Sequence, residues 1–288
     1  MFKSRLFLAL CCTVMLVAGC GSANRISYDT PQEAFGKGKV LYEEGKYTAA
    51  ITYFQGVFSF GRTHQWAADA QLYLARAYRD NKEYLLASNE YERFTKIYRA
   101  DPRLARVNFE RAETFAQMSP APALDQSDTK RAIQEFQLFI DRFPNDDLIG
   151  EAQEQVVALR TKLAEKQFLT AQLYERRELF EAAALSFESV FDLYPDTPWA
   201  QPALVGAIKM YIAFSDQSIA LRQPERLRSA IKNYDRLIQI FEPSEHHKEA
   251  ESYYEQAQAK LKALQDADAA KDAAMKTAST EAAESTEN

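Results

Sequence analysis

The thiols of this chain are confined to its first twenty residues, as Cys11, Cys12 and Cys20. The remainder therefore has neither a disulfide framework nor a cysteine-based metal site. Lys3 and Arg5 precede an apolar run over residues 6–19. At about 1.5 Å per residue, a helix of that length is too short to cross a hydrocarbon core about 30 Å thick. A basic start followed by such a run is typical of a signal peptide.

Cys20 is the residue whose surroundings predict a covalent reaction. The sequence Val17-Ala18-Gly19-Cys20 resembles a bacterial lipobox, in which small residues precede a cysteine that is acylated on sulfur and becomes the new N-terminus. This resemblance implies a signal peptide over 1–19 and a lipidated tether over 20–30, anchored stably because several acyl chains are attached. Gly21, in place of Asp after the cysteine, implies sorting to the outer membrane. The alternative is an ordinary secretory signal with an incidental cysteine.

No spacing of titratable residues predicts catalysis. The three histidines are His64, which is isolated, and the adjacent pair His246 and His247, whose side chains point in different directions on a helix. The chain has no Gly-x-Ser-x-Gly, no His-Glu-x-x-His and no complete glycine-rich phosphate loop. We therefore expect no enzyme activity, no metal and no cofactor. The formal net charge of −6 also gives no bulk attraction for nucleic acid.

Binding is then the expected activity, and the elements that would support it are helices. From Pro31 onward apolar residues recur three and four apart, and no stretch alternates as a strand would. An alanine followed by an aromatic residue four positions later is typical of the second helix of a tetratricopeptide repeat. The pair occurs five times, as Ala50/Phe54, Ala87/Tyr91, Ala132/Phe136, Ala183/Phe187 and Ala230/Tyr234. The sequence thus predicts an all-α superhelix of about five helical hairpins, and an unrelated helical bundle is the alternative.

The repeats divide the chain into successive regions. Residues 31–145 would hold repeats one to three, and residues 146–265 would hold repeats four and five with a C-terminal capping helix. Small residues in the first helices, among them Gly38 and Ala75, would let the paired helices approach closely. Residues 266–288 contain no large apolar side chain except Met275, so we expect a disordered acidic and alanine-rich tail.

The inner wall of such a superhelix is lined by first helices. The register of the alanines places the following residues of repeats one to three on that wall: Phe35, Lys39, Tyr42, Leu72, Arg76, Arg79 and Phe109. Exposed aromatic rings beside positive charges suit an extended peptide with aromatic side chains and a terminal carboxylate, because arginine pairs with a carboxylate through two hydrogen bonds. Alternatively, the apolar members belong to the core and the arginines are solvated.

Several stretches of the third and fourth repeats resemble the BamD (ComL) family of lipoproteins of the outer-membrane β-barrel assembly machine. They are Arg131-Ala-Ile-Gln-Glu-Phe, Phe143-Pro-Asn, Leu163-Ala-Glu-Lys, Tyr174-Glu-Arg-Arg177 and Tyr194-Pro-Asp-Thr197. The resemblance extends over about residues 31–241. Glu178 departs from it, because the family often has glycine there.

The resemblance implies a scaffold in the outer membrane that faces the periplasm. Its C-terminal repeats, here with Tyr174, Arg176 and Arg177, would bind the POTRA domains of a BamA-like insertase. Its N-terminal repeats would hold unfolded β-barrel clients, and other lipoproteins of the machine could join. Two alternatives stay open: a repeat lipoprotein that coordinates cell-wall synthesis or envelope integrity, and a glycan-binding lipoprotein. The second is disfavoured because glycan-binding lipoproteins usually have insertions rich in tryptophan and glycine, whereas this chain has two tryptophans and nine glycines.

Overall fold

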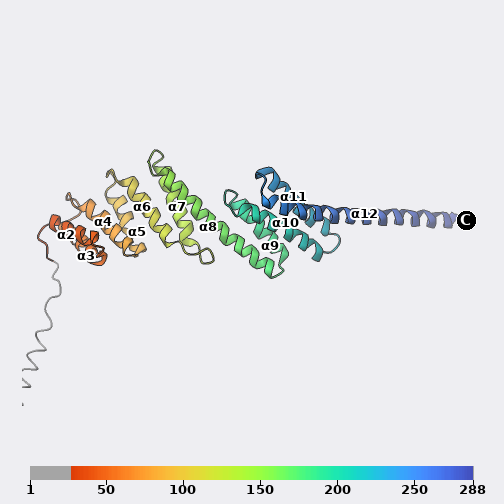
Figure 1. Cartoon of the computed structure of the whole chain (residues 1–288), viewed down its shortest axis with the longest axis horizontal. Helices are drawn as coiled ribbons and strands as arrows, with labels where there is room; N and C mark the ends of the chain where they lie inside the picture. Colours follow the sequence, from red (N-terminus) through yellow and green to blue (C-terminus); the bar gives the residue numbers. More distant parts are fainter. Residues whose placement is uncertain (1–26, 288) are drawn as a thin grey trace, which may run out of the picture. The chain divides into compact units, whose positions relative to one another are not determined.

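A computed structural model describes residues 27–287, with side-chain exposure described as far as residue 277. Every regular element over this range is a helix (Figure 1). The predicted signal peptide, residues 1–19, and Cys20 lie outside the described residues. The chain divides into two compact units, Met1–Arg111 (unit one) and Ala112–Asn288 (unit two).

Unit one contains two helical pairs followed by the start of a third. The first pair is α2 (Pro31–Glu43) and α3 (Tyr47–Val57), with a short 3-10 helix η1 (Phe58–Phe60) after it. The second pair is α4 (Ala67–Asp80) and α5 (Tyr84–Ile97), and α3 also packs on α4. The helix α6 (Leu104–Met118) spans the division between the units.

Unit two continues with α7 (Ser127–Arg142) and the long α8 (Ile149–Arg176), which packs on both α7 and α9 (Phe180–Leu193). The next pair is α10 (Ala200–Gln217) and α11 (Gln223–Ile240). The final helix, α12 (Glu245–Glu287), packs on both of them through Ala250, Ala257 and neighbouring side chains. The pairs α2/α3, α4/α5, α8/α9 and α10/α11 pack directly and α12 covers the last of them, so the predicted tetratricopeptide fold is confirmed.

The alanine register holds at atomic detail. The five alanines lie in α3, α5, α7, α9 and α11, and all five side chains are fully buried. Gly38 shows why the facing helix needs a small residue, because a Cβ there would lie 2.8 Å from the ring of Phe54. Gly206 on α10 has a similar role toward the preceding pair, because a Cβ there would lie 3.0 Å from the ring of Phe187 on α9. A larger side chain at either glycine would have to displace a buried ring.

The turns inside three pairs share one conformation. Gly45, Lys82 and Glu178 each stand two residues before the second helix, and all three have positive φ, at 73°, 64° and 57°. This left-handed region is natural for glycine and costs other residues about 1 kcal/mol or more. Glu178 therefore keeps the turn that a glycine would form, although the side chain differs.

The C-terminal segment differs from its expected disorder. α12 continues without a break to Glu287, and the side chains of residues 265–277 are all exposed. Alanine is the most frequent residue of the segment and has the highest helix propensity. Because the packed N-terminal half of α12 already supplies the helix nucleus, extension needs no further burial. The described side chains of this segment add nothing to the core, while its helical backbone differs from the expected disorder.

Candidate functional site

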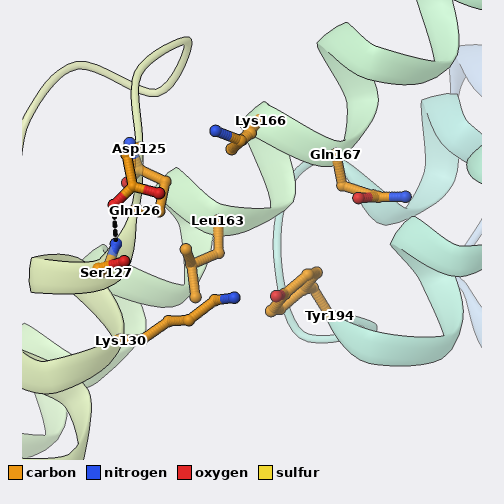
Figure 2. A pocket seen from close by; sticks show the side chains of 8 residues that line it. All are labelled: Asp125, Gln126, Ser127, Lys130, Leu163, Lys166, Gln167 and Tyr194. Carbon is orange, nitrogen blue, oxygen red and sulfur yellow. Dashed lines mark hydrogen bonds between the residues drawn. The ribbon is translucent and has the colours of Figure 1, made fainter.

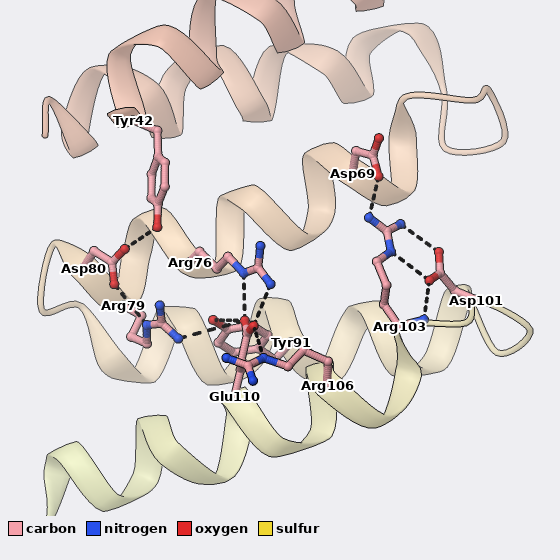
Figure 3. A network of polar contacts seen from close by, with 10 residues as sticks. All are labelled: Tyr42, Asp69, Arg76, Arg79, Asp80, Tyr91, Asp101, Arg103, Arg106 and Glu110. Atoms are coloured by element: carbon pink, nitrogen blue, oxygen red, sulfur yellow. Dashed lines mark hydrogen bonds and ion pairs between the residues drawn. The ribbon is translucent and has the colours of Figure 1, made fainter. Parts of the chain in front are cut away.

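A buried carboxylate in unit one organises the polar side chains of α2, α4, α5 and α6 (Figure 3). Glu110 of α6 is 2% exposed, and its carboxylate accepts two hydrogen bonds from Arg76, at 2.8 Å from Nε and 2.6 Å from Nη2. Arg106 Nε donates to the same carboxylate at 3.1 Å, and so does Tyr91 Oη at 3.1 Å. We call Glu110 and these partners, with Arg79, Asp80 and Tyr42, the Glu110 network.

The second half of the network joins the first two repeats. Tyr42 Oη on α2 donates to Asp80, and Arg79 Nε donates to the other oxygen of the same carboxylate at 3.0 Å. Arg79 Nη1 also lies 3.9 Å from Glu110 Oε2. Burial raises the pKa of Tyr42, and its hydrogen bond to Asp80 raises it further, so the phenol stays a proton donor. The network therefore fixes α2 to α4 through Tyr42 and α4 to α6 through Glu110.

The electrostatics of the network favour an ionised glutamate and leave an excess of positive charge. Burial by itself raises the pKa of Glu110, but the hydrogen bond and charge of Arg76, with contributions from Arg106 and Arg79, outweigh it. The resulting pKa lies below the ordinary value for glutamate. Three guanidinium groups face two carboxylates, so the five charged groups together carry one net positive charge. Such a surface attracts a carboxylate-bearing ligand.

The structure corrects part of the predicted peptide-binding wall. Phe35, Leu72 and Phe109 are 7%, 1% and 0% exposed, so their assignment to an exposed inner wall is wrong. Phe35 packs against the rings of Phe54, Trp66 and Tyr73 instead. Phe35 and Leu72 belong to the core because α2 and α4 each pack on their own partner helix and on a helix of the neighbouring repeat, which buries two faces rather than one.

The polar members of that set do lie together. Tyr42, Arg76 and Arg79 are the half-exposed part of the Glu110 network, and Lys39 lies one turn before Tyr42 on α2. The side chain of Lys39 is 46% exposed and forms a long ion pair of 3.8 Å with Glu43. Sequence reasoning missed Glu110 and Asp80, the acidic partners that position these cations. One signal was present: Glu110 continues the buried stripe of α6 that includes Val107 and Thr114, where a charged residue needs a partner.

The set predicted to bind a partner protein lies at the end of α8 in unit two. Tyr174 is half-buried against the core, whereas Arg176 and Arg177 are exposed. Neither arginine forms an ion pair with another residue of the described part of the chain. Positive side chains at a helix C-terminus are favoured by the helix dipole, so the position of the two arginines can be explained without a binding partner. Their charge is nevertheless available to an acidic surface.

Unit two also has a pocket of about 180 Å³ that sequence reasoning did not find (Figure 2). It is lined by residues of the α6–α7 loop, α7, α8 and the end of α9, namely Asp125, Gln126, Ser127, Lys130, Leu163, Lys166, Gln167 and Tyr194. Lys166 Nζ is held by the carbonyl oxygen of Leu124 at 2.5 Å, and Asp125 caps α7 by accepting from Ser127 N at 2.9 Å. Two lysines against one aspartate suit a single acidic side chain of a partner.

Within residues 27–287, no group of three or more metal-ligating side chains is placed to hold an ion. The helices over the same range include none that is both long enough and apolar enough to cross a membrane.

Comparison with known proteins finds a family model and named relatives that match most of this chain. A family model described as an outer membrane lipoprotein, YfiO, matches residues 28–223. The outer membrane protein assembly factor BamD of Vibrio cholerae is 28% identical over 207 residues, which cover 68% of this chain and 86% of that protein. The protein of the same name from Pasteurella multocida is 24% identical, over 70% of this chain and 81% of its own length.

Among solved structures, a TPR repeats protein from Bacteroides fragilis covers 81% of this chain and 99% of its own, with 12% identity and a TM-score of 0.45.

Proposed function

Because this chain belongs to the BamD (YfiO) family of outer membrane lipoproteins, we propose that it acts in the assembly of outer membrane proteins as a scaffold rather than as an enzyme. The observation that carries the proposal is the family match over residues 28–223, which includes helices of both units, from α2 to α10. Relatives that bear the name of an outer membrane protein assembly factor align with most of this chain. Helical repeats with charged side chains held in fixed positions suit the binding of other proteins.

The proposed location is the outer membrane, with the folded repeats in the periplasm and lipid on Cys20 as the anchor. The proposed partners are a BamA-like barrel protein, bound through its POTRA domains, other lipoproteins of the same machine, and unfolded barrel proteins as clients. Unit two would contact the insertase near Tyr174, Arg176 and Arg177. The two arginines support this assignment, since cationic groups that form no ion pair within the described part of the chain can pair with acidic groups across an interface.

Co-purification tests the proposal. The lipidated full-length protein, tagged at its C-terminus and extracted from membranes, should recover a BamA-like barrel protein. Replacing both Arg176 and Arg177 by glutamate should reduce that recovery, whereas the same double change at Lys262 and Lys271, exposed on α12, should not. Recovery of peptidoglycan enzymes without any barrel protein would instead favour the role in cell-wall synthesis.

For client binding, we propose that the exposed cations around the Glu110 network hold the terminal carboxylate of an extended peptide. Arg106 is 50% exposed while its Nε remains hydrogen-bonded to Glu110, and Lys39 is nearly as exposed. Arg76 and Arg79 are less suitable for charge reversal. A glutamate at either position would stand beside buried Glu110 and destabilise the unit, so lost binding could not be told from unfolding.

The corresponding prediction uses the Lys39→Gln, Arg106→Gln double variant. A synthetic peptide with the aromatic C-terminal strand of an outer-membrane barrel should bind wild-type protein more tightly as the free acid than as the C-terminal amide. The double variant should lose most of this preference, and calorimetry at low salt measures it. Arg93→Gln with Lys96→Gln is the matched control, because both residues are exposed on the second helix α5. Equal affinity of acid and amide for wild type would overturn the assignment.

A further inference from the structure

The first described residues are fixed to repeat one, although the sequence predicts only a tether there. Thr30 Oγ1 caps α2 by accepting from Glu33 N at 3.1 Å, and Asp29 N donates to the carboxylate of Glu33 at 3.0 Å. Lys37 Nζ donates to the carbonyl oxygen of Ser27 at 2.8 Å. The chain is therefore fixed to α2 from residue 27 onward.

Tyr28 extends this attachment to α3. A Cβ on Gly56 would lie 2.2 Å from Tyr28 Oη, so the absence of a side chain at Gly56 makes room for the phenol. The ring of Tyr28 lies 6.1 Å from that of Tyr53 and 6.1 Å from that of Phe60, centroid to centroid. We call Tyr28, Tyr53 and Phe60 the aromatic cluster. Gly56 thus determines where the cluster forms.

The length of chain before this attachment limits its distance from the lipid. Cys20 and Ser27 are separated by seven Cα–Cα steps. A fully extended chain spans at most about 3.6 Å per residue, so the two Cα atoms are no more than about 25 Å apart. If Cys20 carries the lipid, as in the proposed function, the aromatic cluster is kept within a similar distance of the membrane surface. A partner protein is not constrained in this way.

The chemistry of the cluster suits the membrane–water interface. Phe60 is 42% exposed, and Tyr28 and Tyr53 are each partly exposed. Two residues after Phe60, the guanidinium of Arg62 lies 4.1 Å from the centroid of the Phe58 ring, and its Nη1 donates to Gln71 Oε1 at 2.9 Å. Tyrosine has an apolar body and a polar hydroxyl, and aromatic side chains of this kind collect at the level of the lipid headgroups. A nearby arginine can pair with lipid phosphate.

We propose that the aromatic cluster of repeat one rests on the phospholipid headgroup region of the membrane that holds the lipid anchor. The side chain of Tyr28 packs against Gly56, and the exposed edges of Tyr28, Tyr53 on α3 and Phe60 on η1 face the bilayer. Repeat one is then attached to the membrane at two places, the lipid on Cys20 and the cluster, and its orientation is restricted. The inference rests on the proposed lipid anchoring but concerns a contact of the folded repeat itself.

The cysteine content of the chain permits a direct test. After processing at Cys20 the mature chain contains no other cysteine, so Ser59→Cys adds one labelling site beside Phe60 and keeps the cluster intact. The lipidated full-length protein carries a fluorophore there and is reconstituted in vesicles of phosphatidylethanolamine and phosphatidylglycerol. Nitroxide-labelled lipids in the same vesicles should quench it. A label at Leu85→Cys on α5, where the native side chain is 64% exposed, should be quenched little.

A second variant tests the role of Tyr28. Gly56→Leu should displace the phenol and abolish the quenching at position 59, while the protein still floats with the vesicles. Gly36→Leu is the matched control, because no atom lies within 4 Å of a Cβ at that helical position. If the protein floats but both labels are quenched equally, or neither is, the contact is refuted and the anchor stands. Failure to float with the vesicles would refute the anchor itself.

Discussion

Replacing Glu110 by glutamine is expected to lower the free energy of unfolding of unit one by about 3 kcal/mol. The substitution preserves the volume of the side chain and removes only its charge. Arg76 and Arg79 are 25% and 19% exposed, so they would lose the counter-charge that offsets their partial desolvation. Removing one partner of a buried ion pair costs roughly 3–5 kcal/mol, and the lower end applies because the arginines keep some contact with water.

Urea unfolding, together with amide hydrogen exchange in α4 and α6, would measure this loss. Glu92→Gln is the matched control. It neutralises a carboxylate in an exposed ion pair with Lys96 on α5, for which about 0–1 kcal/mol is expected. The double variant Glu110→Gln, Arg76→Met should lose less free energy of unfolding than the two single variants together. Each single change leaves one charged partner without its counter-charge, whereas the double change removes both charges. Strict additivity would show that the two side chains do not act as a pair.

The lowered pKa of Glu110 also predicts how the free energy of unfolding depends on pH. Because the pKa of Glu110 is lowered in the folded chain, the unfolded chain binds more protons between the folded and the unfolded pKa, the latter about 4.3. The stabilisation is therefore complete above the unfolded pKa and is lost as the pH falls through the folded one. In the Glu110→Gln variant, stability should depend less steeply on pH below about pH 5. An unchanged slope would assign the acid sensitivity to other carboxylates.

Sequence and structure agree best where packing is set by short spacing. A small residue and an aromatic residue four positions later share one helix face, so Ala183 and Phe187 could be assigned to the pair contact without coordinates. The same reasoning could not find Gly206, because a glycine within a helix has several explanations. Only the position of the Phe187 ring, 3.0 Å from the missing Cβ, identifies its role.

The candidate site was harder to predict because its parts are far apart in the chain. Arg76 and Glu110 are 34 residues apart, and no local pattern indicates which carboxylate an arginine will reach. Periodicity also cannot separate an apolar residue that faces a groove from one that faces the next repeat. That ambiguity explains why Phe109 was wrongly placed on the inner wall. The attachment of Tyr28 could not be predicted for a different reason: Tyr28 is one aromatic residue in a polar stretch, and its contact with Gly56 depends on the fold of α3.

Replacing Cys20 by serine should release the protein from the membrane entirely. Each buried CH₂ of an acyl chain contributes about 0.8 kcal/mol, so two or more chains supply far more binding than three aromatic side chains at an interface can. The variant should still be exported, because residues 1–19 are intact, and should appear in the soluble periplasmic fraction. Cys12→Ser is the control, since position 12 lies within the segment expected to be removed.

Salt and carbonate washes distinguish lipid anchoring from attachment through partners. If the Cys20→Ser protein stays with membranes at low salt and is washed off by carbonate, protein contacts retain it and the assembly role survives without its anchor. If it resists carbonate as the wild type does, Cys20 is not the lipidated residue, and the limit of about 25 Å on the position of repeat one no longer applies. The mass of the mature wild-type protein tests independently whether Cys20 is lipidated. Acylation at Cys20 requires an N-terminus at that residue and a mass increased by the acyl chains. The lipid anchor and the membrane contact of the aromatic cluster can therefore be tested separately. The anchor depends on the sulfur of Cys20, and the cluster depends on the lack of a side chain at Gly56.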